Sequence, residues 1–214
     1  MQKRRARRRT VKTPYYIRAG KQTMIDSHVV DFASRFPGKR LKDIHSLVMA
    51  LSNLKRKKVA LAQMDQYYSK RTASQILQDG FVIIDRCVDS YRGEPMAEDR
   101  LPVQGCVDYH VALCAVLRAK GIQARFVRKG NHSIVHFFLY GRWYEADVNR
   151  GVSLRKAIAF RSRHRSATIE IREPIRRLES DEIKKHKQDG NYKHGLDAWD
   201  IGIKSIRDYD RYNK

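Results

Sequence analysis

The sequence lacks long apolar runs and has few cysteines, and each shortage argues against a class of protein. No apolar stretch approaches the roughly 20 residues that a membrane-spanning helix needs. No apolar segment follows the basic N-terminus, as one would in a secretory signal. The 214 residues include only 3 cysteines, Cys87, Cys106 and Cys114. A disulfide scaffold is therefore disfavoured, and a reducing, cytoplasmic location is expected.

Acidic residues are also scarce, whereas apolar residues are not. Lysine and arginine number 45 against 23 aspartates and glutamates, a net charge of +22 that favours attraction to anions. Hydrophobic residues make up 42% of the chain, which is enough for a folded core. The length suits one domain with short extensions. We expect a basic disordered arm, a folded domain, and a polar linker with a final amphipathic helix, at residues 1–23, 24–178 and 179–214.

The predicted arm, residues 1–23, contains nine basic residues and no acidic one. Such a run is typical either of an arm that contacts nucleic acid or another polyanion, or of a solvated tail. A second arginine-rich segment, at 151–178, would extend a polyanion-binding surface. Within the arm, the contacts would come above all from Arg4, Arg5, Arg7, Arg8 and Arg9.

Apolar side chains recur at helical spacing in the N-terminal third of the chain. Thr72 followed by Gln75 forms a capping-box pattern, which opens a short helix that ends at Gly80. The short apolar run at 82–84 fits either a helix or a strand. The N-terminal region is therefore predicted to be helical, with further helices at residues 29–36, 41–54 and 58–68.

A second pattern begins at Gly105 and Cys106, which open a segment that is apolar on more than one side. This pattern indicates a central, buried helix, and Gly121 lies where a helix C-terminal glycine is expected. Strands follow, two of them joined by a tight turn at Gly141 and Arg142. The predicted strands are at 122–128, 133–140, 143–147 and 166–171, and the final helix is at 196–206.

The stretch from Gly105 to Asp147 combines the residue types of a thiol-dependent catalytic site. The positive end of a helix dipole stabilises a thiolate, so Cys106 is placed as a nucleophile. The N–H groups at the same helix end would bind the oxyanion that forms on a carbonyl under attack. A histidine would move the proton, and Asp147 would orient that histidine. His132 and His136 are four residues apart on one strand, so alternation places both on the same side and does not choose between them.

Three sequence features occur in order along this stretch. The first is Gly105-Cys106-Val107-Asp108-Tyr109, and the second is Leu117-Arg118-Ala119-Lys120-Gly121-Ile122-Gln123-Ala124-Arg125. The third is the spacing of His132, Trp143 and Asp147. Together they resemble the core of the transglutaminase-like superfamily, which has a papain-like Cys-His-Asp arrangement. The resemblance covers about residues 72 to 150 and selects His132 rather than His136.

The resemblance implies an α+β fold, in which a helical N-terminal region and a cysteine-bearing central helix pack on an antiparallel sheet. It also implies a cysteine-dependent acyl-transfer enzyme with catalytic residues Cys106, His132 and Asp147. With water as the acceptor, the enzyme would be a protease or amidase acting on a protein or peptide. With an amine as the acceptor, it would be a transglutaminase-type acyltransferase.

Outside the triad, the chain departs from the family pattern at Ile134, at Val148 and in an insertion at 89–104. This insertion is predicted to be a long loop, either a lid or a surface addition. In related cysteine enzymes an upstream side chain completes the oxyanion hole, and Gln104 is the candidate by its position. The candidate substrate-groove residues are His136 and Trp143, the latter alternatively an anchor of the core.

Two other interpretations of these residues are open. Cys106, His110 and Cys114 follow one another at intervals of four, so they would form one helix face, and this stripe could suggest a zinc site. Zinc prefers four tetrahedral ligands, so a plain helix face is favoured and no metal or other cofactor is expected. The alternative function is a basic nucleic-acid-binding module on a catalytically idle transglutaminase-like scaffold, for which the net charge is the evidence.

Overall fold

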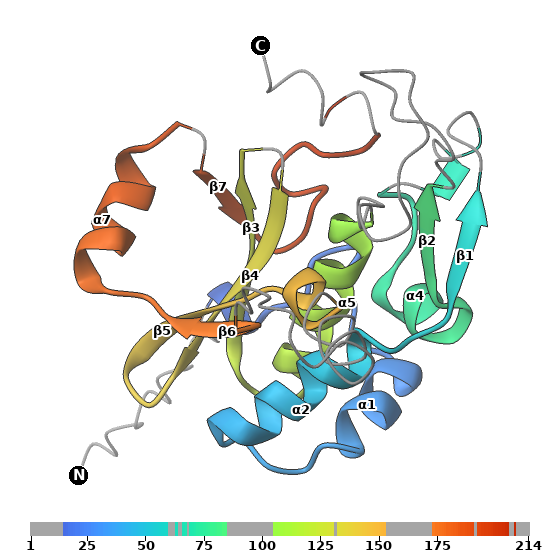
Figure 1. Cartoon of the computed structure of the whole chain (residues 1–214), viewed down its shortest axis with the longest axis horizontal. Coiled ribbons are helices and arrows are strands. Elements are labelled where there is room, and N and C mark those ends of the chain that lie inside the picture. Colours follow the sequence, from blue (N-terminus) through green and yellow to red (C-terminus); the bar gives the residue numbers. More distant parts are fainter. Residues whose placement is uncertain are drawn as a thin grey trace, which may run out of the picture.

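The computed structural model describes residues 15–59, 63, 66–67, 69–84, 105–130, 132–152, 173–190, 192–205 and 208. Within this part of the chain, a five-stranded antiparallel sheet packs against a central helix, and smaller elements surround that helix (Figure 1). The predicted mixture of helices with an antiparallel sheet is confirmed. No helix of the described residues is long and apolar enough to cross a membrane.

The central helix, α5 (Cys106–Ala119), is the best-buried element of the structure. Every side chain from its first residue to Arg118 is buried, as its apolar sequence predicts. The chain leaves the helix at Gly121, two residues after Ala119, and the φ of Gly121, +71°, lies in the left-handed region that favours glycine. There the Gly121 N–H donates to the Arg118 carbonyl at 2.8 Å, and the Ile122 N–H donates to the Leu117 carbonyl at 3.0 Å.

The sheet has the strand order β6-β5-β4-β3-β7, with every pair antiparallel. The three predicted strands after α5 are confirmed. A two-residue turn joins β4 to β5, and both Tyr140 and Gly141 have positive φ, which matches the twist of paired strands. The turn lies one residue earlier than predicted. The strand bounds are β3 (Gln123–Lys129), β4 (His132–Leu139), β5 (Arg142–Ala146), β6 (Ile175–Arg177) and β7 (Tyr192–Gly195).

The two faces of the sheet have different environments. Phe126, Val135 and Phe137 are buried in the core that includes α5. The opposite face carries Arg125 and His136, and helix α7 (Ser180–Gln188) lies on that side (Figure 1). The sheet is therefore covered on both faces, with apolar contacts on one side and mainly polar contacts on the other.

The N-terminal helices follow the apolar spacing of the sequence. Helices α1 (Ser27–Ser34) and α2 (Leu41–Leu51) bury their apolar stripes, and a short 3-10 helix, η1 (Tyr15–Ile17), precedes them. Helix α4 (Ala73–Asp79) opens with the predicted capping box. The Thr72 N–H donates to Gln75 Oε1 at 2.9 Å, and the Gln75 N–H donates to Thr72 Oγ1 at 3.4 Å.

The prediction of a helical N-terminal region is confirmed for α1, α2 and α4 but is wrong where the helix at 58–68 was expected to begin. Strand β1 (Arg56–Val59) occupies the predicted start of the helix at 58–68 and pairs in parallel with strand β2 (Phe81–Ile84). The two segments are distant in sequence, so the pairing that makes each of them a strand is not visible in either one alone. Val59, Phe81 and Val82 are buried there.

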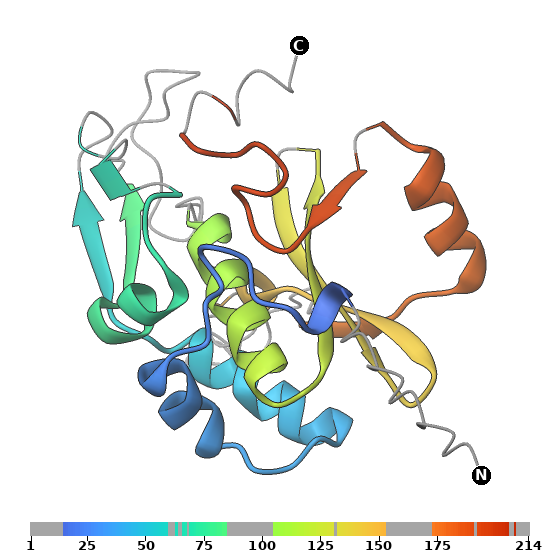
Figure 2. The same cartoon turned by 180° about the vertical axis from the view of Figure 1, so that it is seen from behind.

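Residues 15–23 were predicted to belong to a disordered arm, but they pack on the folded structure, where this segment crosses α5 (Figure 2). Gln22 and Thr23 are fully buried. The Gln22 N–H donates to Asp197 Oδ2 at 2.8 Å, and Arg118 Nη1 donates to Thr23 Oγ1 at 2.7 Å. The rest of the arm, which includes Arg4, Arg5, Arg7, Arg8 and Arg9, lies outside the described residues.

The C-terminal part differs from the prediction in two places. The segment expected to be a polar linker contains helix α7, and the expected amphipathic helix is a series of turns over residues 196–202. Tertiary hydrogen bonds hold these turns, among them Trp199 Nε1–H to the Ser69 carbonyl at 2.5 Å. The predicted loop at 89–104 and strand at 166–171 lie outside the described residues.

Candidate active site

The N-terminus of α5 places Cys106 at the end of a buried helix dipole. Cys106 is the first residue of the helix and is 8% exposed. The preceding Gly105 has φ +128° and ψ +11°, a conformation that glycine adopts readily and other residues rarely do. The first amide groups of a helix point beyond its end rather than to an earlier turn, so an anion at Cys106 is electrostatically favoured.

Two strand ends bring a histidine and a carboxylate to this helix end. His132 is the first residue of β4, and Asp147 directly follows β5, its neighbour in the sheet. His132 Nε2–H donates to Asp147 Oδ2 at 2.9 Å, and the His132 side chain is also hydrogen-bonded to the Cys106 side chain. Because Nε2 is used by Asp147, Nδ1 is the ring nitrogen left for the thiol. The three side chains thus lie in the order Cys106, His132, Asp147.

The charges of this cluster support one another. Burial disfavours a charged His132, but the hydrogen bonds and negative charges of Asp147 and Cys106 outweigh it and raise the pKa of His132 to about 10. Burial also acts against the Asp147 carboxylate, yet the hydrogen bond from His132 and the positive charge on that ring hold the pKa of Asp147 well below its usual range. At neutral pH the cluster therefore favours a protonated His132 beside an ionised Asp147.

Asp147 is held by further contacts that the sequence reasoning did not identify. Asp147 Oδ1 accepts the Asn149 N–H at 2.9 Å, and Arg150 Nε lies 3.4 Å from Oδ2. Arg150 also lies 3.1 Å from Glu145, which is 1% exposed and accepts two hydrogen bonds from Arg176. This chain of charges fixes the carboxylate toward His132. The close succession of Glu145, Asp147 and Arg150 was the available sequence signal.

His110 joins the start of α5 to the end of β5 through the backbone. Its Nδ1 lies 2.5 Å from the Cys106 carbonyl, and its Nε2 accepts the Val148 N–H at 3.1 Å. Nε2 therefore carries a lone pair, so its 3.5 Å approach to Asp147 Oδ1 is not a hydrogen bond of the neutral ring. Burial lowers the pKa of His110, which favours this neutral form.

These contacts bear on the zinc interpretation of Cys106, His110 and Cys114. Both nitrogens of His110 are occupied by backbone groups, so neither is available as a metal ligand. Across the described ranges, no group of three or more His, Cys, Asp or Glu side chains is arranged to hold a metal ion.

The two candidate groove residues lie in another environment. Arg125 Nη2 donates to His136 Nδ1 at 3.1 Å, and its guanidinium lies 4.5 Å from the Trp143 ring centre. Four residues of a strand span about 13 Å, so His136 is well separated from His132 although the two share a strand. The structure therefore does not bring His136 and Trp143 to Cys106, and Gln104 lies outside the described residues.

Replacing Gly105 with alanine is expected to displace the Cys106 side chain relative to His132. A Cβ at φ +128° strains the backbone by about 1–3 kcal/mol, and relief of that strain would shift the first turn of α5. A displacement of about 1 Å can cost roughly 100-fold in rate. Alkylation kinetics of Cys106 and thermal unfolding would measure the two effects.

Gly141→Ala is the matched control, because Gly141 also has positive φ, +75°, and nothing within 4 Å of an added Cβ. It should lower the unfolding temperature without changing Cys106 reactivity. Equal reactivity in both variants would contradict a positioning role for Gly105.

Comparison with known proteins finds only a distant structural likeness. No protein-family model matches the chain, and no curated protein matches it. One similar solved structure is that of a candidate cysteine protease from Cytophaga hutchinsonii, with 13% sequence identity and a TM-score of 0.49. The match covers 88% of this chain and 48% of that chain, so this chain spans about half the length of its neighbour. A likeness this distant carries no inference about fold or chemistry.

Proposed function

We propose that the protein is a cysteine-dependent hydrolase of amide or peptide bonds, with Cys106 as nucleophile, His132 as proton carrier and Asp147 as its orienting carboxylate. One observation carries the proposal: His132 is hydrogen-bonded to both Asp147 and Cys106 at the N-terminus of a buried helix. The proposal includes a papain-like or transglutaminase-like core, supported by the packing of α5 on the antiparallel sheet.

The first half of the proposed reaction forms an acyl-enzyme. The Cys106 thiolate attacks the carbonyl carbon, a C–S bond forms, and the C=O electron pair moves onto oxygen. The resulting oxyanion is stabilised by the amide groups at the start of α5, including that of Cys106. When the pair returns, the C–N bond breaks, and the His132 imidazolium gives its proton to the leaving amine.

The second half releases the acyl group. Neutral His132 accepts a proton from water, whose oxygen attacks the thioester carbon. The C–S bond then breaks, which gives a carboxylic acid and restores the thiolate beside an imidazolium. Asp147 keeps His132 in the required orientation throughout, and it stays ionised because its pKa is held low. An amine in place of water would give acyl transfer by the same steps.

Selective alkylation of Cys106 tests the proposed nucleophile. The raised pKa of His132 keeps an imidazolium beside the sulfur until the pH rises through about 10. The alkylation rate of an ordinary thiol falls roughly 50-fold between about pH 8.5 and about pH 6.5. We expect Cys106 to lose less than about tenfold over this interval, measured with iodoacetamide and peptide mass spectrometry.

Cys114 is an internal control in the same experiment, because it is fully buried and burial raises its pKa to about 11. It should react only when the protein unfolds. Labelling of Cys106 that is no faster than labelling of Cys114, or that has the pH dependence of a free thiol, would contradict the proposed nucleophile. Hydrolysis of a fluorogenic peptide library, lost in Cys106→Ala, would establish the substrate class.

A further inference from the structure

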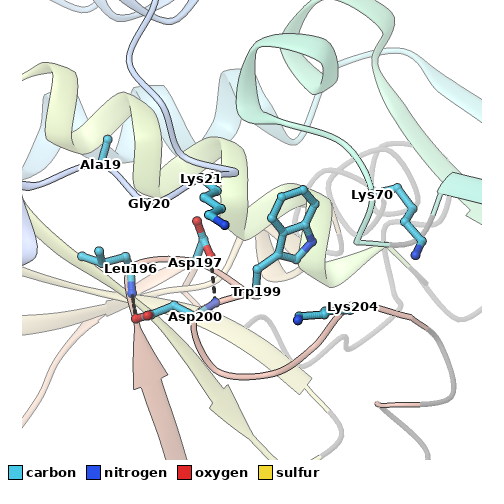
Figure 3. A pocket seen from close by; sticks show the side chains of 9 residues that line it. All are labelled: Ala19, Gly20, Lys21, Lys70, Leu196, Asp197, Trp199, Asp200 and Lys204. Carbon is cyan, nitrogen blue, oxygen red and sulfur yellow. Dashed lines mark hydrogen bonds between the residues drawn. The ribbon is translucent and has the colours of Figure 1, made fainter.

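A cavity of 710 Å³ is lined by residues other than those of the Cys106 cluster (Figure 3). Its walls come from residues 19–21, from Lys70, and from the C-terminal turns at 196–204. The volume falls in the range of roughly 300–1,000 Å³ that is typical of small-ligand sites. Because none of these lining residues belongs to the proposed catalytic site, that site does not explain the cavity.

Three lysines from three separate segments line this cavity: Lys21, Lys70 and Lys204. In the described part of the chain, none of their ammonium groups lies within ion-pair distance of a carboxylate. The carboxylates in the wall are turned to the backbone instead. Asp197 accepts N–H groups of Gln22 and Asp200, at 2.8 and 3.0 Å, and Asp200 accepts the Leu196 N–H at 2.8 Å.

An immobilised aromatic ring stands among these lysines. The indole Nε1–H of Trp199 donates to the Ser69 carbonyl at 2.5 Å, and its backbone N–H donates to Gln22 Oε1 at 3.2 Å. Figure 3 shows the indole with Lys21 to one side, Lys70 to the other and Lys204 below it. Because the ring is already held, a planar ligand could pack on it at little cost in conformational entropy.

We propose that this cavity binds a nucleotide unit, a phosphate joined to a planar base, either free or within a single strand of RNA or DNA. Ammonium groups neutralise phosphate, and an aromatic side chain stacks on a base of any sequence. An acidic peptide would satisfy the three lysines but leave the fixed indole without a role. The net charge of +22 would concentrate such anions near the protein.

The test uses the full chain and two probes: a fluorescein-labelled oligo(A) of about 12 nucleotides, a length within the usual single-strand site sizes, and adenosine monophosphate. Fluorescence polarisation follows the first. Quenching of Trp199 follows the second, in a Trp143→Phe background, because the chain has only 2 tryptophans. We expect the triple variant Lys21→Gln, Lys70→Gln, Lys204→Gln to bind the oligonucleotide roughly tenfold more weakly. Its slope of log affinity against log salt should be smaller by about 2, as expected for three phosphate contacts of a single strand.

A matched control removes three exposed lysines elsewhere: Lys39→Gln, Lys42→Gln, Lys184→Gln. This control should change affinity less than about twofold. Trp199→Leu should weaken binding roughly tenfold, and Trp199→Phe, which keeps a ring, should weaken it less. Competition by the mononucleotide would identify a free nucleotide as sufficient, and binding of the oligonucleotide alone would identify a strand. An equal loss in both lysine triples, or no binding of either probe, would overturn the proposal.

Discussion

Replacing Asp147 with asparagine is expected to lower amide hydrolysis roughly 10⁴-fold while leaving the fold intact. The introduced amide would keep an oxygen for the Asn149 N–H, but it would lack the charge that holds the His132 imidazolium. The pKa of His132 would fall, and the ring would no longer be fixed with Nε2–H toward residue 147. Steady-state hydrolysis of a peptide substrate, with alkylation of Cys106 as a second readout, would measure the loss.

Glu173→Gln is the matched control for this substitution. Glu173 is a carboxylate 3.8 Å from His45, on an exposed part of the surface, so it pairs with a histidine without lying at the proposed site. This variant should hydrolyse substrate like the unaltered protein. A loss of less than about tenfold in a folded Asp147→Asn variant would show that the carboxylate does not orient His132.

Replacing Asp108 with alanine is expected to destabilise the protein by about 3–5 kcal/mol. Asp108 lies in the first turn of α5, is 3% exposed, and is paired with the buried Arg71. Its removal leaves a guanidinium in the core whose other bond is to the Gly80 carbonyl at 2.7 Å. Denaturation by urea, followed by circular dichroism, would measure the change in the free energy of unfolding.

A double variant separates the unpaired charge from the loss of packing. Arg71→Met with Asp108→Leu removes both charges and keeps apolar volume, so it should recover at least half of the loss. Lys184→Met with Asp181→Leu is a surface control. Both side chains of that pair are exposed, and its removal should change stability by less than about 1 kcal/mol. A double variant as unstable as Asp108→Ala would contradict the unpaired-charge explanation.

Local patterns in the sequence predicted the elements whose signals are contained within one segment. Helix α5 is apolar on more than one side and has glycines near both ends, and α4 carries its own capping box. The β4–β5 hairpin is predicted by a glycine turn between two alternating strands. For these elements, the residues that determine the structure are neighbours in the chain, so tertiary contacts strengthen a preference that is already present.

The missed elements depend on distant partners. Strand β1 carries the basic run Arg56-Lys57-Lys58, which is typical of a helix end, and its strand character follows from pairing with β2 about 25 residues later. The spacing of Leu196, Trp199 and Ile203 fits a helix, but hydrogen bonds to Gln22 and Ser69 hold turns there instead. Helix α7 has almost no apolar stripe, and it is held by ion pairs such as Glu182 with Arg176.

The sequence also predicted which side chains form the candidate site, but not the contacts that hold those side chains in place. The order of Cys106, His132 and Asp147 follows from motif spacing, and the structure brings their side chains together. The contact of Glu145 with Arg176 depends on how β5 pairs with β6, which no local pattern encodes. His136 shares a strand with His132, and their separation of four residues, about 13 Å along the strand, keeps His136 away from the site although alternation places both on one face.

The contact between Gln22 and Asp197 spans 175 residues, and it has a consequence for biosynthesis. Ala198 and Ile203 belong to the same buried core as α5. While the chain is being made, α5 leaves the ribosome about 80 residues before these turns do. The nascent protein therefore cannot close this side of its core until translation has passed residue 203. An emerging chain would expose apolar surface to chaperones during that interval, and Gln22 would gain its hydrogen bond to Asp197 only after it.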